Sequence, residues 1–172
     1  MNFYESLGFL VFGSRLRRLS ESFLADVNSV YKHHKIKFDA SWFPVFYILS
    51  EKQAVSIKDI SDELNISHSA VSQLVTNLQS KGLIKISTAK DDGRKKVLTF
   101  TSKGNQLLQQ VKPIWQALQD SMEELINENK DSKKVLQAVA GVERGLQTAS
   151  LFNRIEGKLK IPARLRHSGG EN

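Results

Sequence analysis

Residues 56–101 read SIKDISDELNISHSAVSQLVTNLQSKGLIKISTAKDDGRKKVLTFT, and this stretch decides the fold. Ser56 and Asp59 have the spacing of a capping box, in which each side chain accepts a hydrogen bond from the other residue's backbone N–H. Apolar residues recur at helical spacing up to Leu64. Asn65 tolerates the left-handed backbone that ends a helix in a tight turn. The pattern predicts a short first helix.

A second helix follows this turn, with Ser67 as its cap. Its inner face is predicted from four apolar residues at helical spacing: Val71, Leu74, Val75 and Leu78. Gly82 stands just past its end. Two strands, 83–87 and 97–101, then flank a basic turn that contains glycine. The whole predicts a winged helix-turn-helix, a shape that carries one helix into the major groove of DNA.

Four motifs occur here in a specific order: Ser67-His68-Ser69-Ala70-Val71-Ser72-Gln73-Leu74-Val75, Lys81-Gly82-Leu83-Ile84, Asp92-Gly93-Arg94 and Leu98-Thr99-Phe100-Thr101-Ser102-Lys103-Gly104. With long helices on both sides, they resemble the multiple antibiotic resistance regulator (MarR) family of bacterial transcription factors. The resemblance covers most of the chain. It implies a mainly α fold with a small β-hairpin wing (α+β), in which a winged helix-turn-helix is flanked by long dimerisation helices from both termini.

The composition is that of a soluble globular protein, with 40% hydrophobic and 25% charged residues among 172. No apolar run approaches the roughly 18 residues that cross a bilayer, so no membrane partner is expected. The N-terminal residues lack the basic region of a signal peptide, and the expected location is the cytoplasm. The absence of cysteine removes disulfides, thiolate nucleophiles and thiolate zinc sites.

The formal charge of +7 favours a polyanionic partner, and its distribution strengthens this interpretation. One basic group clusters around the predicted wing: Lys81, Lys85, Lys90, Arg94, Lys95 and Lys96. A second group lies near the C-terminus: Arg154, Lys158, Lys160, Arg164 and Arg166.

Helical periodicity predicts long helices before and after the winged segment. The first runs over residues 5–33, although Gly8 and Gly13 weaken its first turns. The next helix begins at Asp39 or at Ser41, and the sequence leaves both open because Pro44 is tolerated only in a first turn.

After Thr101 a further long helix is expected, kinked or split by Pro113. Asp131 or Ser132 can cap another helix, whose apolar spacing continues through Ala149. We expect a helical dimerisation region at 1–38 and 102–161, a winged helix-turn-helix domain at 39–101 and a disordered tail at 162–172.

The second helix of the pair carries the predicted DNA-reading residues: Ser67, His68, Ser69, Ser72, Gln73, Thr76 and Asn77. Each can exchange a hydrogen bond with a base edge, and Gln73 or Asn77 can pair bidentately with adenine. An ordinary solvated face is the alternative, but such a face usually mixes both charge signs, and acidic residues are scarce here. Relatives often carry arginine where His68, Gln73 and Asn77 stand, so much of the affinity is expected to shift to the wing.

The predicted DNA contacts of the wing are Lys90, Asp92, Arg94, Lys95 and Lys96. Gly93 permits the tight turn, and Asp92 can hold Arg94 by a charge-assisted hydrogen bond. The resemblance implies that Arg94 enters the minor groove, with Lys95 and Lys96 near phosphates. A basic hairpin that serves only solubility is the alternative.

Aromatic residues concentrate between Phe38 and Tyr47, and such clusters are more often core than ligand-binding surface. The ligand hypothesis is a cleft for a small aromatic or phenolic effector, with Arg15 as the charge partner. Its predicted lining is Phe12, Arg15, Trp42, Phe43 and Phe46. The resemblance implies that such a molecule releases the protein from DNA.

Catalytic signatures are absent from the sequence. No glycine-rich phosphate loop follows a strand, no serine-centred elbow occurs, and no His/Asp/Glu set has metal spacing. The prediction is therefore no enzyme, no cofactor and no metal. We expect a sequence-specific transcriptional regulator, a ligand-responsive repressor that binds a palindromic operator in double-stranded DNA as a homodimer. A nonspecific DNA-organising protein and a helical protein-interaction module without DNA binding are the alternatives.

Overall fold

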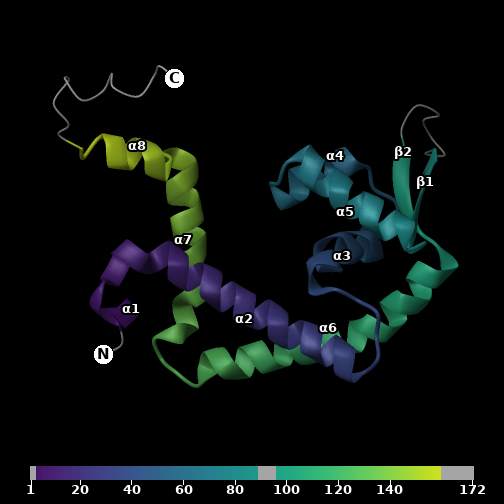
Figure 1. The fold of residues 1–172 in the computed structure, drawn as a ribbon, viewed down its shortest axis with the longest axis horizontal. Helices are drawn as coiled ribbons and strands as arrows, with labels where there is room; N and C mark the ends of the chain where they lie inside the picture. The colour runs from purple at the N-terminus through teal and green to yellow at the C-terminus, as the bar shows by residue number, and fades with distance from the viewer. Residues whose placement is uncertain (1–2, 89–95, 160–172) are drawn as a thin grey trace, which may run out of the picture. The chain divides into compact units, whose positions relative to one another are not determined.

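The computed structural model describes residues 3–88 and 96–159. The chain divides into two compact units, Met1–Gln119 and Asp120–Asn172. Helices dominate both, and the first unit also carries an antiparallel hairpin (Figure 1). The fold class is therefore confirmed as mainly α with a small β-hairpin wing.

The first unit contains most of the regular structure. Its helices are α1 (Phe3–Ser6), α2 (Phe12–His33), α3 (Phe43–Lys52), α4 (Ile57–Leu64), α5 (His68–Ser80) and the start of α6 (Ser102–Asn127). Its strands are β1 (Ile84–Thr88) and β2 (Lys96–Phe100), and its two 3-10 turns span Gly8–Val11 and Ala40–Trp42. The second unit holds the end of α6, a 3-10 turn at Ser132–Lys134, α7 (Val135–Thr148) and α8 (Leu151–Glu156).

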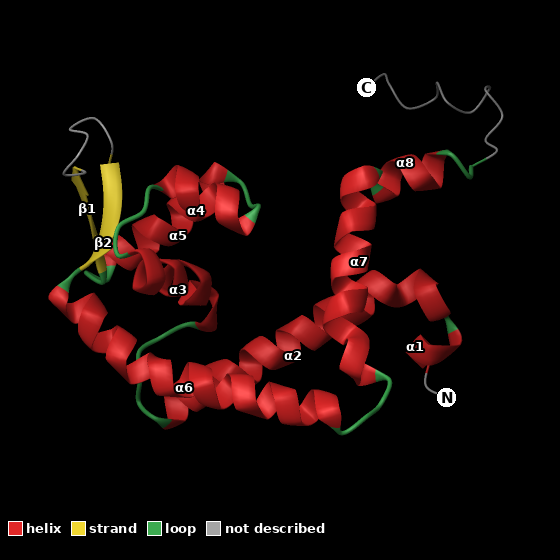
Figure 2. Cartoon of the chain, turned by 180° about the vertical axis from the view of Figure 1, so that it is seen from behind, coloured by secondary structure: helices red, strands yellow, loops and turns green. Residues whose placement is uncertain are grey.

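A single hydrophobic core holds the first unit together. Helices α3, α4 and α5 gather beside the hairpin (Figure 2), and the end of α2 and the first turns of α6 complete the core. Its most deeply buried members are Tyr31, Val45, Phe46, Leu49, Ile60, Val71, Val75, Leu78, Leu98 and Val111. Among the described residues after Gln119, by contrast, no hydrophobic side chain is buried.

The hairpin pairs β1 with β2 from Ile84 opposite Phe100 to Thr88 opposite Lys96. Val55 adds an isolated antiparallel bridge to Leu98, with N–O distances of 2.8 and 3.3 Å. This bridge attaches the residue just before the Ser56 cap of α4 to the outer side of β2.

The prediction of one continuous helix over residues 5–33 was wrong at its start. Gly8 has a φ of +53° and interrupts the chain, so that α1 and a 3-10 turn precede α2. A left-handed residue cannot continue an α-helix, and glycine adopts this conformation at little cost. The long helix therefore begins at Phe12 rather than near Glu5.

The second helix begins at neither of the two predicted positions, Asp39 and Ser41, but both residues take part in the turn that precedes it. The Asp39 side chain accepts a hydrogen bond from the Ser41 N–H at 2.8 Å, but the turn that it caps is a 3-10 turn. Helix α3 begins only at Phe43, which places Pro44 in its first turn. Proline fits there because the first-turn N–H groups have no partner within the helix.

Two expectations for the C-terminal helices need correction. Pro113 does not split α6, which is one helix from Ser102 to Asn127. The helix expected to be capped by Asp131 or Ser132 begins instead at Val135, after the 3-10 turn, and among the residues described the Asp131 side chain makes no capping hydrogen bond. The predicted run through Ala149 agrees with the end of α7, and Ser150 then caps α8 by accepting from the Asn153 N–H at 3.2 Å. Arg154 folds back and donates to the carbonyls of Gly145 and Ala149, which satisfies the end of α7.

A tight junction joins the end of α5 to the start of α6. Thr101 caps α6 by accepting from the Gly104 N–H at 3.0 Å, and its hydroxyl lies 2.7 Å from the Gly82 carbonyl, to which it donates. The Thr101 N–H donates to the Leu83 carbonyl at 3.1 Å. A Cβ added at Gly104 would lie 2.0 Å from the same oxygen, so only glycine allows this approach.

Gly104→Ala is expected to lower the free energy of unfolding by about 2–3 kcal/mol, because the methyl group would force the two backbones apart. Gly141→Ala in α7 is the control, since nothing lies within 4 Å of its added Cβ. We expect that change to raise helix stability by about 0.5–1 kcal/mol. Urea unfolding followed by circular dichroism measures both. Equal effects of the two substitutions would contradict the described contact.

Tyr31 and Trp115 close the aromatic end of the core. The Trp115 indole N–H donates to the Tyr31 hydroxyl at 3.1 Å. The Tyr31 ring packs edge-on against Phe38, with 4.9 Å between centroids. Burial raises the pKa of the Tyr31 hydroxyl, and the hydrogen bond from Trp115 acts in the opposite direction.

The raised pKa predicts that stability falls as pH rises above about 10, because the unfolded chain then ionises Tyr31 while the folded chain resists. Tyr31→Phe should cost about 1 kcal/mol at neutral pH by leaving the indole N–H without its partner. It should also flatten the decline above about pH 10, where the unfolded chain ionises this tyrosine. The check is urea unfolding from neutral pH to above about pH 10, with the exposed Tyr47→Phe as control. Parallel curves for Tyr31→Phe and the unaltered protein would refute the linkage.

Candidate nucleic-acid interface

The orientation of α5 is fixed by its cap and its apolar side. The Ser67 hydroxyl accepts from the Ala70 N–H at 3.2 Å, as predicted. Val71, Val75 and Leu78 are almost completely buried against the core, and Leu74 is half-buried. Because a helix repeats every 3.6 residues, this burial leaves the opposite side of α5 in solvent.

The seven predicted DNA-reading residues all lie on this outer side or at its edge. Six are exposed, and Ser72 is half-buried. The His68 Nδ1 lies 3.4 Å from the Ser72 hydroxyl, and the Thr76 hydroxyl donates to the Ser72 carbonyl at 2.8 Å. Within the described residues, the side-chain amides of Gln73 and Asn77 form no hydrogen bond. Both amides are therefore available to an external donor or acceptor.

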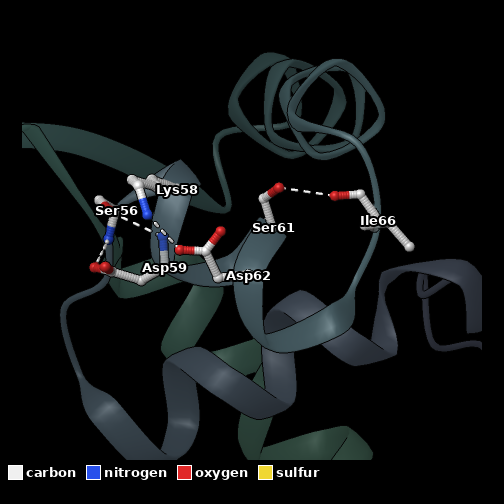
Figure 3. A network of polar contacts seen from close by, with 6 residues as sticks. All are labelled: Ser56, Lys58, Asp59, Ser61, Asp62 and Ile66. Carbon is white, nitrogen blue, oxygen red and sulfur yellow. Dashed lines mark hydrogen bonds and ion pairs between the residues drawn. The ribbon is translucent and has the colours of Figure 1, made fainter. Parts of the chain in front are cut away.

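The turn between α4 and α5 is held by local hydrogen bonds (Figure 3). The predicted capping box of Ser56 and Asp59 is confirmed, with N–O distances of 3.0 and 3.1 Å. Asn65 has a φ of +51°, the left-handed conformation expected of it. The Ser61 hydroxyl donates to the Ile66 carbonyl at 2.7 Å and closes the turn. These contacts set the angle at which α5 leaves α4.

The wing is described only along its strands. Lys85 and Lys96 are exposed, and Lys96 begins β2. The predicted contact residues Lys90, Asp92, Arg94 and Lys95 lie outside the described residues.

An open surface pocket of about 450 Å³ lies where α4, α5 and the hairpin meet. It is lined by Ser56, Ile57, Lys58, Asp59, His68, Ile86, Lys96, Val97 and Leu98. The fold thus brings His68 of α5, the predicted recognition helix, close to Lys96 of the wing. It adds Lys58, which sequence reasoning did not select. A hydrogen bond to Asp62 raises the pKa of Lys58 and keeps it charged (Figure 3).

Within one chain, the structure does not gather the predicted effector residues in one described pocket. Phe12 and Arg15 line a pocket at the start of α2, whereas Trp42 lines a different pocket. Phe46 is completely buried in the core, and its ring lies 5.0 Å from that of Phe38. Much of the aromatic cluster is therefore core, the alternative that the sequence left open.

Phe43 differs from the buried members of the cluster because it is 38% exposed. Its ring lies 5.0 Å from Trp115 and 5.5 Å from Tyr47. The effector cleft stays a prediction.

In the described ranges 3–88 and 96–159, no group of three His, Asp or Glu side chains is placed to hold a metal ion. None of the helices within these ranges is long and apolar enough to span a bilayer.

A family model described as "MarR family" matches residues 37–95, the segment that contains α3, α4, α5 and β1. A search of curated protein sequences found no significant match.

Solved structures share the fold at low sequence identity. The M. tuberculosis transcriptional regulator MosR in complex with DNA has a TM-score of 0.64 and 16% identity, covering 80% of this chain and 97% of its own. The S. aureus MepR–DNA complex has a TM-score of 0.62 and 17% identity, covering 80% and 96%. S. aureus MarR in complex with salicylate and kanamycin has a TM-score of 0.59 and 21% identity, covering 85% and 96%.

Proposed function

We propose that this chain is a transcriptional regulator of the MarR family, whose model matches residues 37–95, and that it binds a palindromic site in double-stranded DNA as a homodimer. The observation that carries the proposal is the outer side of α5. This side exposes hydroxyl, imidazole and amide groups and has no acidic residue to repel phosphates. No enzymatic activity is part of the proposal, and its place of action is the cytoplasm.

The described geometry suits direct reading of bases. An exposed helix of this kind fits the major groove, where an amide such as Gln73 or Asn77 pairs bidentately with adenine. Lys58 and Lys96 flank His68 at the start of α5 and are positioned for backbone phosphates. For Arg94 we keep the minor-groove role suggested by the family resemblance.

The solved structures with a similar fold support the proposal in two ways. The MosR and MepR structures were solved with DNA, which agrees with DNA binding. The S. aureus MarR structure contains salicylate, a small aromatic acid. By analogy we propose that a small phenolic or aromatic acid weakens DNA binding, which makes the chain a ligand-responsive repressor.

Exposed apolar surface supports the homodimer. On α7, Val135, Val139, Val142 and Leu146 form one stripe at helical spacing and are each 36–45% exposed. Leu16, Leu19 and Leu24 of α2 are 42–50% exposed. Large apolar surfaces of this kind are usually covered by a partner, most often a second copy related by a two-fold axis. The helical dimerisation region at 1–38 and 102–161 is proposed on this ground.

The DNA proposal is tested by first selecting bound duplexes from a random pool, which should yield an inverted repeat. On that duplex Gln73→Ala should weaken binding by about 1–3 kcal/mol, relax the base preference at one position per half-site and leave the salt dependence unchanged. Arg94→Ala should weaken binding to selected and unrelated duplexes alike and reduce the salt slope by about one per site. Fluorescence anisotropy across a salt series measures both.

The results for the two variants distinguish a sequence-specific regulator from a DNA organiser and from a protein-interaction module. Because Gln73 is exposed, its variant should retain the unfolding free energy within about 0.5 kcal/mol. Equal losses for both variants on every duplex would identify a DNA organiser. Failure to bind any duplex in a salt-dependent way would leave a protein-interaction module and refute the proposal.

The homodimer is tested by Leu146→Glu, which places a charge on the α7 stripe and should shift a dimer of twice 19.4 kDa toward monomer. Gln137→Glu adds the same charge on the opposite side of α7 and should leave the mass unchanged. Sedimentation equilibrium at micromolar concentration distinguishes them. A single-chain mass for the unaltered protein would overturn this part of the proposal.

A further inference from the structure

A second basic pocket lies at the other end of α5, within the unit Met1–Gln119. It is an open pocket of about 390 Å³, formed where the loop after α2, the turn after α5 and the first turns of α6 meet. We call it the lysine pocket. Its lining residues are Lys35, Lys37, Trp42, Lys81, Leu83, Lys103, Gln106, Leu107 and Gln110.

The rim of the lysine pocket is strongly positive. Four lysines line it, and no Asp or Glu does. The ion pairs found among the described residues, Arg17–Glu21, Lys52–Glu63 and Lys58–Asp62, involve none of the four. Like charges held around one cavity repel each other, so a bound anion would gain from all of them.

The floor of the lysine pocket is apolar. Trp42 is half-buried, and Leu83 and Leu107 are buried beneath the rim. The Lys81 ammonium lies 5.3 Å from the centroid of the Trp42 ring, so the pocket already holds a cation against this ring. A tryptophan face beside two leucines favours a flat ring as the occupant.

Backbone hydrogen bonds hold the three segments in place. Lys35 has a φ of +58°, and the next N–H, of Ile36, donates to the Tyr31 carbonyl at 2.8 Å. The Leu83 N–H donates to the Leu78 carbonyl at 3.0 Å. The Lys103 ammonium donates to the Lys81 carbonyl at 2.7 Å, which ties α6 to the turn after α5. A site on fixed backbone binds with a smaller entropic cost than one on a free loop.

We propose that the lysine pocket binds a small planar molecule that carries two or more negative charges, such as a nucleotide or an aromatic dicarboxylate. Its ring packs beside Trp42 on the apolar floor, its anionic groups lie among the four lysines, and Gln106 and Gln110 hydrogen-bond to its polar edge. This inference does not rest on the proposed DNA binding, and its test requires no DNA.

DNA phosphates are the other anions that four lysines attract, but two observations favour a small molecule. Helix α5 has 13 residues, so Lys81 is separated from the Ser67 cap by about 20 Å along the helix axis. A phosphate backbone would also leave the apolar floor of the pocket unused. The lysines therefore form a site distinct from the outer side of α5.

The test is isothermal titration of the full chain with two probes, ATP and phthalate, which separate the nucleotide from the aromatic dicarboxylate. Adenosine serves as the uncharged control. At least one probe should bind the unaltered protein, and adenosine should bind at least tenfold more weakly than ATP. The double variant Lys81→Gln/Lys103→Gln should weaken binding of the probe at least tenfold. Lys112→Gln/Lys133→Gln removes the same charge outside the pocket and should change it less than twofold.

Gln110→Glu provides a second variant that leaves all four lysines intact, should the double variant fail to fold. It brings a negative charge to the rim and should weaken binding of the probe severalfold. Absence of binding by both probes at millimolar concentration would overturn the proposal. Equal weakening by the pocket and control double variants would do the same. So would a loss of DNA affinity and salt slope in the pocket variant without any probe binding, because the lysines would then serve DNA phosphates.

Discussion

The contact between Gly104 and the Leu83 carbonyl is the constraint on which the rest of the first unit depends. At this point the end of α5, the start of β1 and the start of α6 share one small set of backbone atoms. Thr101 joins them, since its hydroxyl contacts the Gly82 carbonyl and accepts from the Gly104 N–H. A displacement of α6 at this junction must therefore be accommodated by the recognition helix, the hairpin or both.

The two ends of α5 serve different chemistry. Its first turns present uncharged polar groups beside Lys58 and Lys96, whereas its last residues lead into the lysine pocket. The apolar side between them is committed to the core through Val71, Val75 and Leu78. One helix thus connects the proposed DNA surface with the proposed anion site, and the junction at Gly104 lies beside the second of these.

Sequence predicted those features whose causes lie within a few residues. The capping box at Ser56, the left-handed Asn65 and the inner face of α5 were all correct, because side chain and backbone partner are close in the chain. The break at Gly8 was not predicted from the sequence, since glycine is tolerated inside helices as well as in turns.

Other features depend on partners far along the chain. The Val55–Leu98 bridge and the lysine pocket join segments that no local pattern connects. Composition likewise cannot separate Phe46, which is core, from Phe43, which is partly exposed.

The hydrogen bond between Trp115 and Tyr31 spans 84 positions of the chain, whereas that between Thr101 and Gly82 spans 19. Loop-closure entropy makes the longer closure about 1 kcal/mol more costly. During synthesis the hairpin and the α4–α5 pair can therefore assemble as soon as they leave the ribosome. Tyr31 can form its hydrogen bond only later, after Trp115 has been synthesised.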